Sequence, residues 1–383
     1  MSLYIGIEGV GLRQSVAVVA DAKGRILSAY RMLGEPLFLQ TTDRNLLRTR
    51  LTKIIREVAF RAGRNLSDLE DAIVCIGLSG VTFPYDADVD LPTEFSKLGI
   101  RIKRLVCTGD AEIVFASHAH AAKGSAIVCN MGSTAFVATP ENFVRYGGWG
   151  PAIGDEGSGY WIGKEVLRAI GEEFDRGDEP TELWKAIDKW LSKPNTCEYA
   201  DWIGASLLWR KRRLEYEREK RAYDKRTAIC SFAHAMSLQK EWEWRAVLSS
   251  LTIPLMRAWE QGNEAAENIL ARAADHLVRQ YKHACVRAKV PGTFSPLVLY
   301  GGVLTHNSKF RGLVVEKLSR RLKPPCEVLT PTSPKTMRPA CGALLYALGD
   351  SLTGALRLPS HEVINTLAVE QENAHTSGEL NND

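Results

Sequence analysis

Residues 147–163 read GGWGPAIGDEGSGYWIG, and this stretch is the strongest functional signal in the chain of 383 residues. Its glycines surround two acidic residues, Asp155 and Glu156. Glycine has no Cβ, so a backbone rich in glycine can approach a bound ligand closely. A helix that begins after such a loop adds unpaired N–H groups. The stretch therefore predicts a ligand-binding loop that leads into a helix.

The acidic pair in this loop has two interpretations. A carboxylate can accept hydrogen bonds from neighbouring hydroxyl groups of a sugar. It can also cap the first turn of the helix that follows. We favour ligand contact for Asp155, and both interpretations stay open for Glu156.

Outward from the loop, the sequence contains the same arrangement twice. Three short apolar runs separated by turns predict a meander of strands, and alternating helices and buried strands follow the first meander. Two copies of a meander followed by strand and helix predict a duplicated α/β architecture. The first copy has strands at 3–7, 15–20 and 26–32, a helix at 42–62, and strands at 72–78 and 102–107; the second meander has strands at 126–129, 135–139 and 143–145.

The rest of the chain is mostly helical by pattern. Apolar residues recur at helical spacing from residue 160 to about 290. We then expect a strand at 296–300, a helix at 307–322, a strand at 327–329 and a helix that begins at Pro339. Residues 359–383 are polar and nearly free of aromatic residues, which predicts a disordered tail.

Composition excludes several classes of protein. The formal net charge is +4, and basic residues alternate with acidic ones, which argues against a nucleic-acid or membrane partner. The N-terminus lacks the basic and apolar segments of a secretion signal, and no apolar run is long enough to span a membrane. We therefore expect a cytoplasmic protein. Its eight cysteines contain no CxxC pair and are expected to be buried, reduced thiols.

Asp110 is the candidate catalytic residue. It follows the predicted strand that ends near Cys107 and begins the predicted helix 110–122. The carboxyl ends of strands are where α/β sheets bind ligands, and a carboxylate there can act as a general base. The alternative is an N-cap for the helix.

The motif GGWG followed by GDEGSGYWIG resembles the signature of N-acetylglucosamine kinases and of the related BadF/BadG-type ATPases. Further positions that fit this family occur across about residues 1–350. The resemblance implies an actin-like ATPase fold, with two ribonuclease H-like lobes, a central cleft and a helical insertion in the second lobe. The implied boundaries are 1–117 for the first lobe, 118–336 for the second with its insertion at about 165–290, and 337–358 for a closing helix.

The resemblance also implies roles for individual residues. Gly109-Asp110-Ala111 matches the family's Thr-Asp-Ala, whose aspartate takes the proton from the sugar hydroxyl. The acceptor is then held by Gly147, Gly148, Trp149, Asp155 and Glu156.

Two hairpins are expected at the nucleotide phosphates. The first hairpin spans residues 6–13. Its nucleotide-binding residues would be Glu8, which would orient Mg²⁺ through water, and Gly9, Gly11 and Arg13. The second hairpin spans residues 129–133, and its nucleotide-binding residues would be Gly132 and Ser133. Both hairpins depart from the family pattern, at Val10, Leu12 and Met131. A lost donor to transition-state charge can lower the rate about 100-fold or more.

The adenosine end is expected at residues 299–307, where Gly301, Gly302 and Asn307 would contact the nucleotide. A strand-to-helix turn without a ligand is the alternative for this segment. Gly342 in the closing helix has a packing role and no chemistry. Most of the tryptophans fall between Trp184 and Trp259, where they are expected to fill the core between helices, with an oligomer interface as the alternative.

The resemblance implies an ATP-dependent phosphotransferase that uses ATP and Mg²⁺ to phosphorylate a hydroxyl of an amino sugar or a similar small acceptor. The altered hairpins favour an alternative, a catalytically weak or inactive subunit that senses nucleotide or sugar. The family also contains activators that hold an iron–sulfur cluster, but residues 117–124 contain no cysteine. The family's sugar-binding asparagine is absent from residues 34–40, which puts N-acetylglucosamine itself in question as the acceptor. A homodimer is a further expectation.

Overall fold

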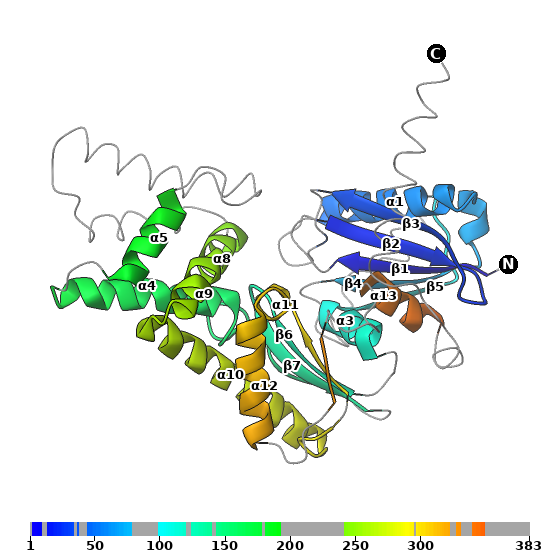
Figure 1. The fold of residues 1–383 in the computed structure, drawn as a ribbon. Coiled ribbons are helices and arrows are strands. Elements are labelled where there is room, and N and C mark those ends of the chain that lie inside the picture. The colour runs from blue at the N-terminus through cyan, green and yellow to red at the C-terminus, as the bar shows by residue number, and fades with distance from the viewer. Residues whose placement is uncertain are drawn as a thin grey trace, which may run out of the picture.

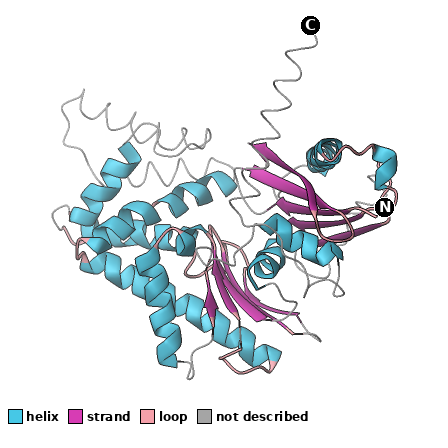
Figure 2. Cartoon of the chain, turned by 45° about the vertical axis from the view of Figure 1, so that its right-hand side comes forward, coloured by secondary structure: helices cyan, strands magenta, loops and turns pink. Residues whose placement is uncertain are grey.

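The computed structural model describes residues 2–9, 14–33, 37, 44–78, 99–119, 124–139, 143–177, 181–192, 241–294, 296–321, 327–330 and 339–348. The predicted tail at 359–383 and the sugar-binding asparagine segment, except for Leu37, lie outside these ranges. Two five-stranded sheets organise the described residues, and Figure 2 shows them as two separate groups of strands.

The first sheet has the strand order β3-β2-β1-β4-β5. Its first three strands pair antiparallel, whereas β4 and β5 run parallel to β1. The expected meander and the two buried strands are thereby confirmed. The strands are β1 (Tyr4–Gly9), β2 (Gln14–Ala20), β3 (Ile26–Leu33), β4 (Ile73–Leu78) and β5 (Arg104–Gly109).

Strand β2 shows why helices cover both faces of this sheet. Its side chains alternate between faces, as they do in any strand. Ala17 and Val19 belong to the core beneath α1 (Arg44–Arg61), while Val16 and Val18 belong to the core beneath α13 (Pro339–Leu348). Because both sets are apolar, the strand is buried on both sides. A short 3₁₀ helix, η1 (Leu66–Leu69), precedes β4.

The second sheet has the order β8-β7-β6-β9-β10 and repeats the topology of the first. Strands β6, β7 and β8 form the antiparallel meander, and β9 and β10 continue in parallel from β6. The predicted duplication is therefore present in the backbone. The strands are β6 (Gly124–Cys129), β7 (Ser133–Ala138), β8 (Phe143–Gly147), β9 (Leu297–Tyr300) and β10 (Val328–Leu329).

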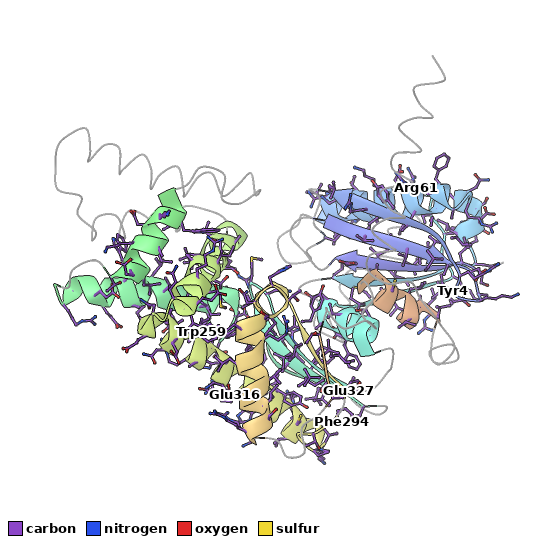
Figure 3. The ribbon with its side chains drawn as sticks, in the orientation of Figure 1. Tyr4, Arg61, Trp259, Phe294, Glu316 and Glu327 are labelled. Atoms are coloured by element: carbon purple, nitrogen blue, oxygen red, sulfur yellow. The ribbon has the colours of Figure 1, made fainter. Side chains whose placement is uncertain are left out.

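The described residues between β8 and β9 are mostly helical. The longest, α10, begins after the cap residue Asn263, whose side chain accepts the N–H of Ala266, and it packs against β7 and β8. Trp184, Trp190 and Trp259 are buried in the core of this lobe, as expected, and Figure 3 labels Trp259. The helices are α4 (Gly159–Asp175), α5 (Glu182–Ser192), α8 (Glu241–Ser250), α9 (Thr252–Glu260) and α10 (Glu264–Ala288), with α11 (Gly302–Thr305) and α12 (Ser308–Arg321) after β9.

Helix α3 (Asp110–Ala119) lies between the two sheets (Figure 1). On one side it packs against α13, where a Cβ on Gly342 would collide with the carbonyl oxygen of Ile113. On the other side Phe115 meets Phe136 of β7 edge to face, with 5.5 Å between ring centroids. The helix that begins at Asp110 therefore joins the two lobes.

The described cysteines are free thiols, and Cys75, Cys129, Cys285 and Cys341 are buried as expected. The expectation is wrong for Cys107, which is exposed because β5 is the edge strand of its sheet. Within the described ranges, no helix combines the length and the apolar character needed to span a bilayer.

Candidate functional site

Glu8 and Asp110 lie at the same edge of the first sheet. Strands β1, β4 and β5 are parallel, and Gly9, Leu78 and Gly109 lie side by side in the register. Glu8 is buried near the end of β1, and Asp110 follows β5 directly as the first residue of α3. Both carboxylates are thus at the carboxyl ends of parallel strands, where α/β sheets bind ligands.

Two further residues, Ala340 and Glu112, belong to this edge of the first sheet. The backbone N–H of Ala340, in the first turn of α13, donates to Oε2 of Glu8 at 3.3 Å. Glu112, two residues after Asp110, is buried, and this burial raises the pKa of its carboxyl to about 7. The charge of Asp110 raises the Glu112 pKa further, and that of Arg145 lowers it. This edge therefore carries three carboxylates, and the charge of Arg145 from the second lobe acts on one of them, Glu112.

The matching edge of the second sheet brings together the second hairpin and the segment expected to bind adenosine. Val128 of β6 pairs with Tyr300 of β9, so the residues after both strands are neighbours. The N–H of Gly302 donates to Oδ1 of Asn130 at 2.6 Å. Gly301 has φ 107°, and a Cβ there would collide with the carbonyl of Cys129. Only glycine fits this close approach.

The loop 147–159 is hydrogen-bonded to the second hairpin. Ser133 donates its hydroxyl to the carbonyl oxygen of Glu156 at 2.8 Å. The buried Gln280 of α10 donates to both of these groups, to Ser133 Oγ at 3.1 Å and to Glu156 O at 3.0 Å. The N–H of Gly159 donates to the carbonyl of Asn130 at 2.8 Å. The hairpin and the loop therefore form one rigid unit.

Asp155 is buried within this unit. Its Oδ2 accepts from Arg245 Nη2 of α8 at 3.0 Å, and its Oδ1 accepts from the N–H of Ser133 at 3.4 Å. Burial raises the pKa of the Asp155 carboxyl, and the positive charge of Arg245 opposes that rise. Asp155 does not cap the helix; Ser158 does, because its Oγ accepts the N–H of Trp161 at 3.1 Å. The capping interpretation of Asp155 is therefore wrong.

Arg145 connects the loop with the region of Asp110. Its Nη2 donates to the carbonyl of Gly148 at 3.1 Å, and its Nε donates to Thr134 Oγ1 at 3.3 Å. Its charge lowers the pKa of both Glu112 and Asp155. A single guanidinium thus acts on carboxylates from both lobes.

The turn 147–150 takes a shape that favours glycine. Gly147, Gly148 and Gly150 have φ values of 79°, 72° and 85°, which are left-handed. This backbone leaves Trp149 exposed by 74%. The Glu156 side chain is only partly buried, in contrast to that of Asp155.

The remaining predicted nucleotide-binding residues are located by packing or by a local hydrogen bond. Gly132 lies against Asp155, because a Cβ on it would come within 2.9 Å of Oδ2. Gly9 is buried against Leu78, and the Asn307 side chain donates to the carbonyl of Val303 at 2.9 Å. Gly11 and Arg13 lie outside the described residues.

Sequence reasoning missed four polar residues of this network. Asn130 lay inside the recognised second hairpin and Arg145 just before the glycine-rich loop, and their polar side chains at predicted strand ends were an available signal. Arg245 and Gln280 lie in helices far along the chain, at positions 90 and 147 residues from their partners. No local pattern marks such residues.

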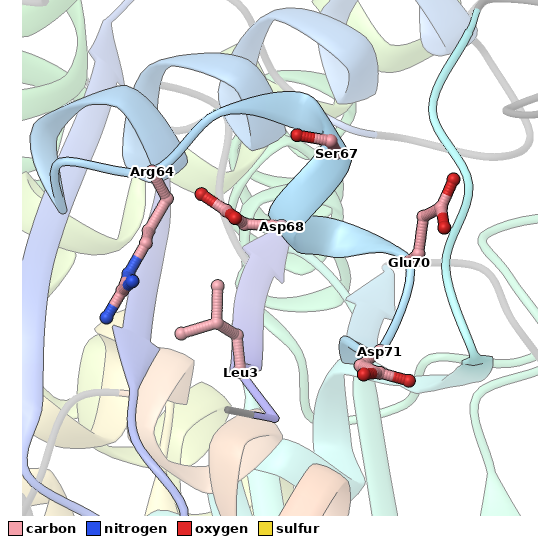
Figure 4. A pocket seen from close by; sticks show the side chains of 6 residues that line it. All are labelled: Leu3, Arg64, Ser67, Asp68, Glu70 and Asp71. Carbon is pink, nitrogen blue, oxygen red and sulfur yellow. The ribbon is translucent and has the colours of Figure 1, made fainter.

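A hollow of about 250 Å³ on the first lobe is separate from this site (Figure 4). It lies beside Leu3 and Asp71, at the amino ends of β1 and β4, whereas Glu8 and Asp110 lie at the carboxyl ends. Asp68 on its wall accepts the N–H of Asn65 at 2.9 Å, which serves the local turn. Among the described residues, no group of three acidic, histidine or cysteine side chains is arranged to hold a metal ion.

Comparison with known proteins agrees with this architecture. Residues 5–347 match the sequence profile of the BadF/BadG/BcrA/BcrD ATPase family. The chain belongs to this family. Among solved structures, this family member resembles a candidate N-acetylglucosamine kinase from Chromobacterium violaceum, with a TM-score of 0.59, 18% identity, and coverage of 90% of this chain and 98% of the other. A second candidate N-acetylglucosamine kinase, from Porphyromonas gingivalis, gives a TM-score of 0.55 at 15% identity, with coverage of 91% and 99%. The two-lobed actin-like ATPase fold is thereby confirmed.

Curated relatives of this BadF/BadG/BcrA/BcrD family member include two kinases. The N-acetyl-D-glucosamine kinase of Dictyostelium discoideum is 26% identical over 367 residues, which cover 90% of this chain and 98% of that protein. The N-acetylmuramic acid/N-acetylglucosamine kinase of Clostridium acetobutylicum is 27% identical over 186 residues. That second match covers 48% of this chain and 58% of the relative, which is less than two thirds of its length.

Proposed function

We propose that this protein is an ATP-dependent phosphotransferase that moves the γ-phosphate of ATP to a hydroxyl of an amino sugar or a similar small acceptor. The observation that carries the proposal is the rigid unit in the second lobe. There the expected acceptor loop, the second phosphate hairpin and the expected adenosine segment are joined through Ser133, Glu156, Asn130 and Gly302. The curated kinases related to the chain support the same reaction class.

The edge of the second sheet fits a nucleotide. A Cβ on Gly301 would meet the carbonyl of Cys129 and one on Gly132 would meet the Asp155 carboxylate, so these glycines allow the second hairpin to pack closely against the expected adenosine segment and the acceptor loop. Glu8 at the facing edge would hold Mg²⁺ through water. Mg²⁺ is usually held by one or two carboxylates together with substrate phosphates. When bound, Mg²⁺ neutralises charge on the phosphates.

Asp110 is the proposed general base. Its carboxylate takes the proton of the acceptor hydroxyl while that oxygen forms a bond to the γ-phosphorus. The bond from this phosphorus to the β–γ bridging oxygen breaks, and ADP leaves. The position of Asp110 at a strand end, next to the helix that joins the lobes, supports this role.

The loop 147–157 is the proposed acceptor site. The Asp155 carboxylate accepts from Arg245 and from the N–H groups of Ser133 and Gly150. A carboxylate has about four acceptor sites, so one remains for a sugar hydroxyl. Trp149, in the same loop, presents an exposed aromatic side chain. A small sugar is therefore the class of acceptor that we propose.

One observation favours the alternative of a nucleotide- or sugar-sensing subunit. Ser133 is the hydroxyl residue of the second hairpin that matches the family pattern. It donates its hydroxyl to the Glu156 carbonyl and its N–H to the Asp155 carboxylate. In this arrangement neither donor is directed at a phosphate. The substitutions at Val10, Leu12 and Met131 act in the same direction.

The test measures ADP release with a panel of amino sugars and neutral sugars, for the wild-type protein, for Asp110→Asn and for the control Asp71→Asn. Asp71 is an exposed aspartate of the same lobe, so its variant makes the same chemical change away from the site. We expect acceptor-dependent release that falls by about 100-fold or more in Asp110→Asn, because a general base contributes about that much. ATP binding without acceptor-dependent turnover in the wild type would favour the sensing subunit instead.

A further inference from the structure

Asp155 holds an unusual backbone conformation. Its φ is 60°, and among the described residues only it and Lys289 combine a positive φ with a side chain. A non-glycine residue in this region is strained, and it persists where the surroundings hold it in place. We therefore expect a contact that holds Asp155 in this backbone conformation.

Arg245 makes this contact. Its Nη2 lies 3.0 Å from Oδ2 of Asp155, and the exposed fractions of the two side chains are 19% and 4%. A charge-assisted hydrogen bond this well shielded from water is stronger than a surface ion pair. Removing one member would leave the other charge buried.

Helix α8 delivers Arg245 to this position through close packing against α4. A Cβ on Gly163 of α4 would collide with the carbonyl of Leu248, and a Cβ on Gly159 would collide with Ser249 Oγ. Because these two glycines are one turn apart, they form a smooth strip along α4. The strip sets the separation of the helices and thereby the place of the Arg245 side chain.

Groups from every neighbouring element face the Asp155 carboxylate. They are Arg245 of α8, Arg145 of β8, the Cys129 thiol of β6, and the N–H groups of Ser133 and Gly150. Burial raises the pKa of Asp155, and Arg245 is the largest influence that opposes this rise. Arg245 therefore does most to keep the carboxylate ionised.

We propose that Arg245 is a positioning residue of the acceptor site: its guanidinium fixes the Asp155 carboxylate beneath the second hairpin in the orientation that accepts a hydroxyl of the acceptor. The inference rests on the proposed acceptor role of Asp155. It assigns to helix α8 a function in acceptor binding and leaves Asp110 as the base.

The proposal predicts a selective effect. Arg245→Gln should weaken acceptor binding by about 10-fold or more, because a hydrogen bond to a charged group contributes roughly 1.5 to 3 kcal/mol. Nucleotide affinity should change much less, since the Arg245 guanidinium donates to Asp155 of the proposed acceptor loop. Arg245→Lys, which keeps the charge, should recover part of the loss.

The pH dependence of acceptor binding should also shift. Without Arg245 the pKa of Asp155 rises further, so the carboxylate takes up its proton at a higher pH. Acceptor affinity of Arg245→Gln should therefore begin to fall at a higher pH than that of the wild type as the solution is acidified. A purely structural loss would lower affinity equally at each pH.

The experiment is calorimetry on the full chain with a non-hydrolysable ATP analogue and with the same panel of amino sugars and neutral sugars, N-acetylglucosamine included. It compares wild type, Arg245→Gln, Arg245→Lys, Asp155→Asn and the double variant. The control is Arg257→Gln, which removes an exposed arginine from the neighbouring helix α9. We expect Asp155→Asn and Arg245→Gln to be non-additive, because the two residues act through one contact.

Two results would overturn the inference: unchanged acceptor affinity in folded Arg245→Gln, or a loss equal to that of Arg257→Gln. Acceptor binding that depends on Arg245 in a protein without turnover would sustain the inference and reject the phosphotransferase. Turnover that is lost in Asp110→Asn but unaffected by Arg245→Gln would support the phosphotransferase and reject the positioning role of Arg245.

Discussion

Glu112 is the residue whose charge state most depends on the fold. The residue is 5% exposed. Burial, followed by the charge of Asp110, raises its pKa from 4.5 to about 7, against the opposing effects of a backbone hydrogen bond and of the Arg145 charge. The folded protein therefore holds this proton more tightly than the unfolded chain does. The stabilising contribution is complete below about pH 4.5 and is lost as the pH rises through about 7.

We predict that Glu112→Gln gains stability relative to the wild type as the pH rises from 5 to 8. The difference should grow by up to about 3 kcal/mol, since one pKa unit corresponds to about 1.4 kcal/mol. Urea unfolding at both pH values measures it. Glu70→Gln, at an exposed position, is the control and should change by less than about 1 kcal/mol. Equal pH slopes for the wild type and Glu112→Gln would contradict the buried, protonated carboxyl.

At the scale of elements, the crossing of α13 and α3 depends on one glycine. A Cβ on Gly342 would collide with the carbonyl of Ile113 and approach the N–H of Ser117, so alanine would force the two helices apart. The packing role expected for Gly342 agrees with this geometry. Gly312 in α12 is also inside a helix, but nothing lies within 4 Å of the place its Cβ would take.

The two alanine substitutions should therefore have opposite signs. Gly342→Ala is expected to lower the free energy of unfolding by roughly 1 to 3 kcal/mol through overpacking. Gly312→Ala should raise it by roughly 0.5 to 1 kcal/mol, because alanine is the better helix former. Chemical denaturation of both variants under one set of conditions gives the comparison. A stabilised Gly342→Ala would show that the helices do not cross this closely.

At the scale of the whole molecule, each lobe has its own core, and the closing helix α13 completes the first. One core is built on the first sheet and α1, another on the second sheet and its helices. Leu344 and Leu345 of α13 pack with Val16 and Val18 of β2 in a third cluster. The first lobe therefore depends on residues from the far end of the described chain (Figure 1).

A chain that ends at residue 338 should lose stability in the first lobe only. We expect amide hydrogen exchange of β1 and β2 to accelerate by roughly 100-fold or more, because exposing two leucines costs about 3 kcal/mol and 1.4 kcal/mol is tenfold. Amides of α10 should keep their protection. A chain that ends at residue 358 retains α13 and is the control. Equal acceleration in both lobes would show that they unfold as one unit.

The sequence by itself determined both sheets, most element positions and the places of Asp110 and the loop 147–159. These features depend on local patterns: apolar runs make strands, helical spacing makes helices, and glycines mark turns. Cys107 lay in an apolar run, yet it is exposed, because no pattern within a strand tells whether it will be an edge. The assignment of Asp155 to a ligand or a cap was likewise open at that level.

Only the tertiary structure decided the partners of the site residues. Arg245 reaches Asp155 across 90 positions, and Gln280 reaches Ser133 across 147. Such contacts form because packing between distant elements brings polar groups out of water together, and each buried group then needs a partner. Hydrophobic periodicity predicts which face of a helix is buried, but it does not predict which polar side chains will contact each other across the core.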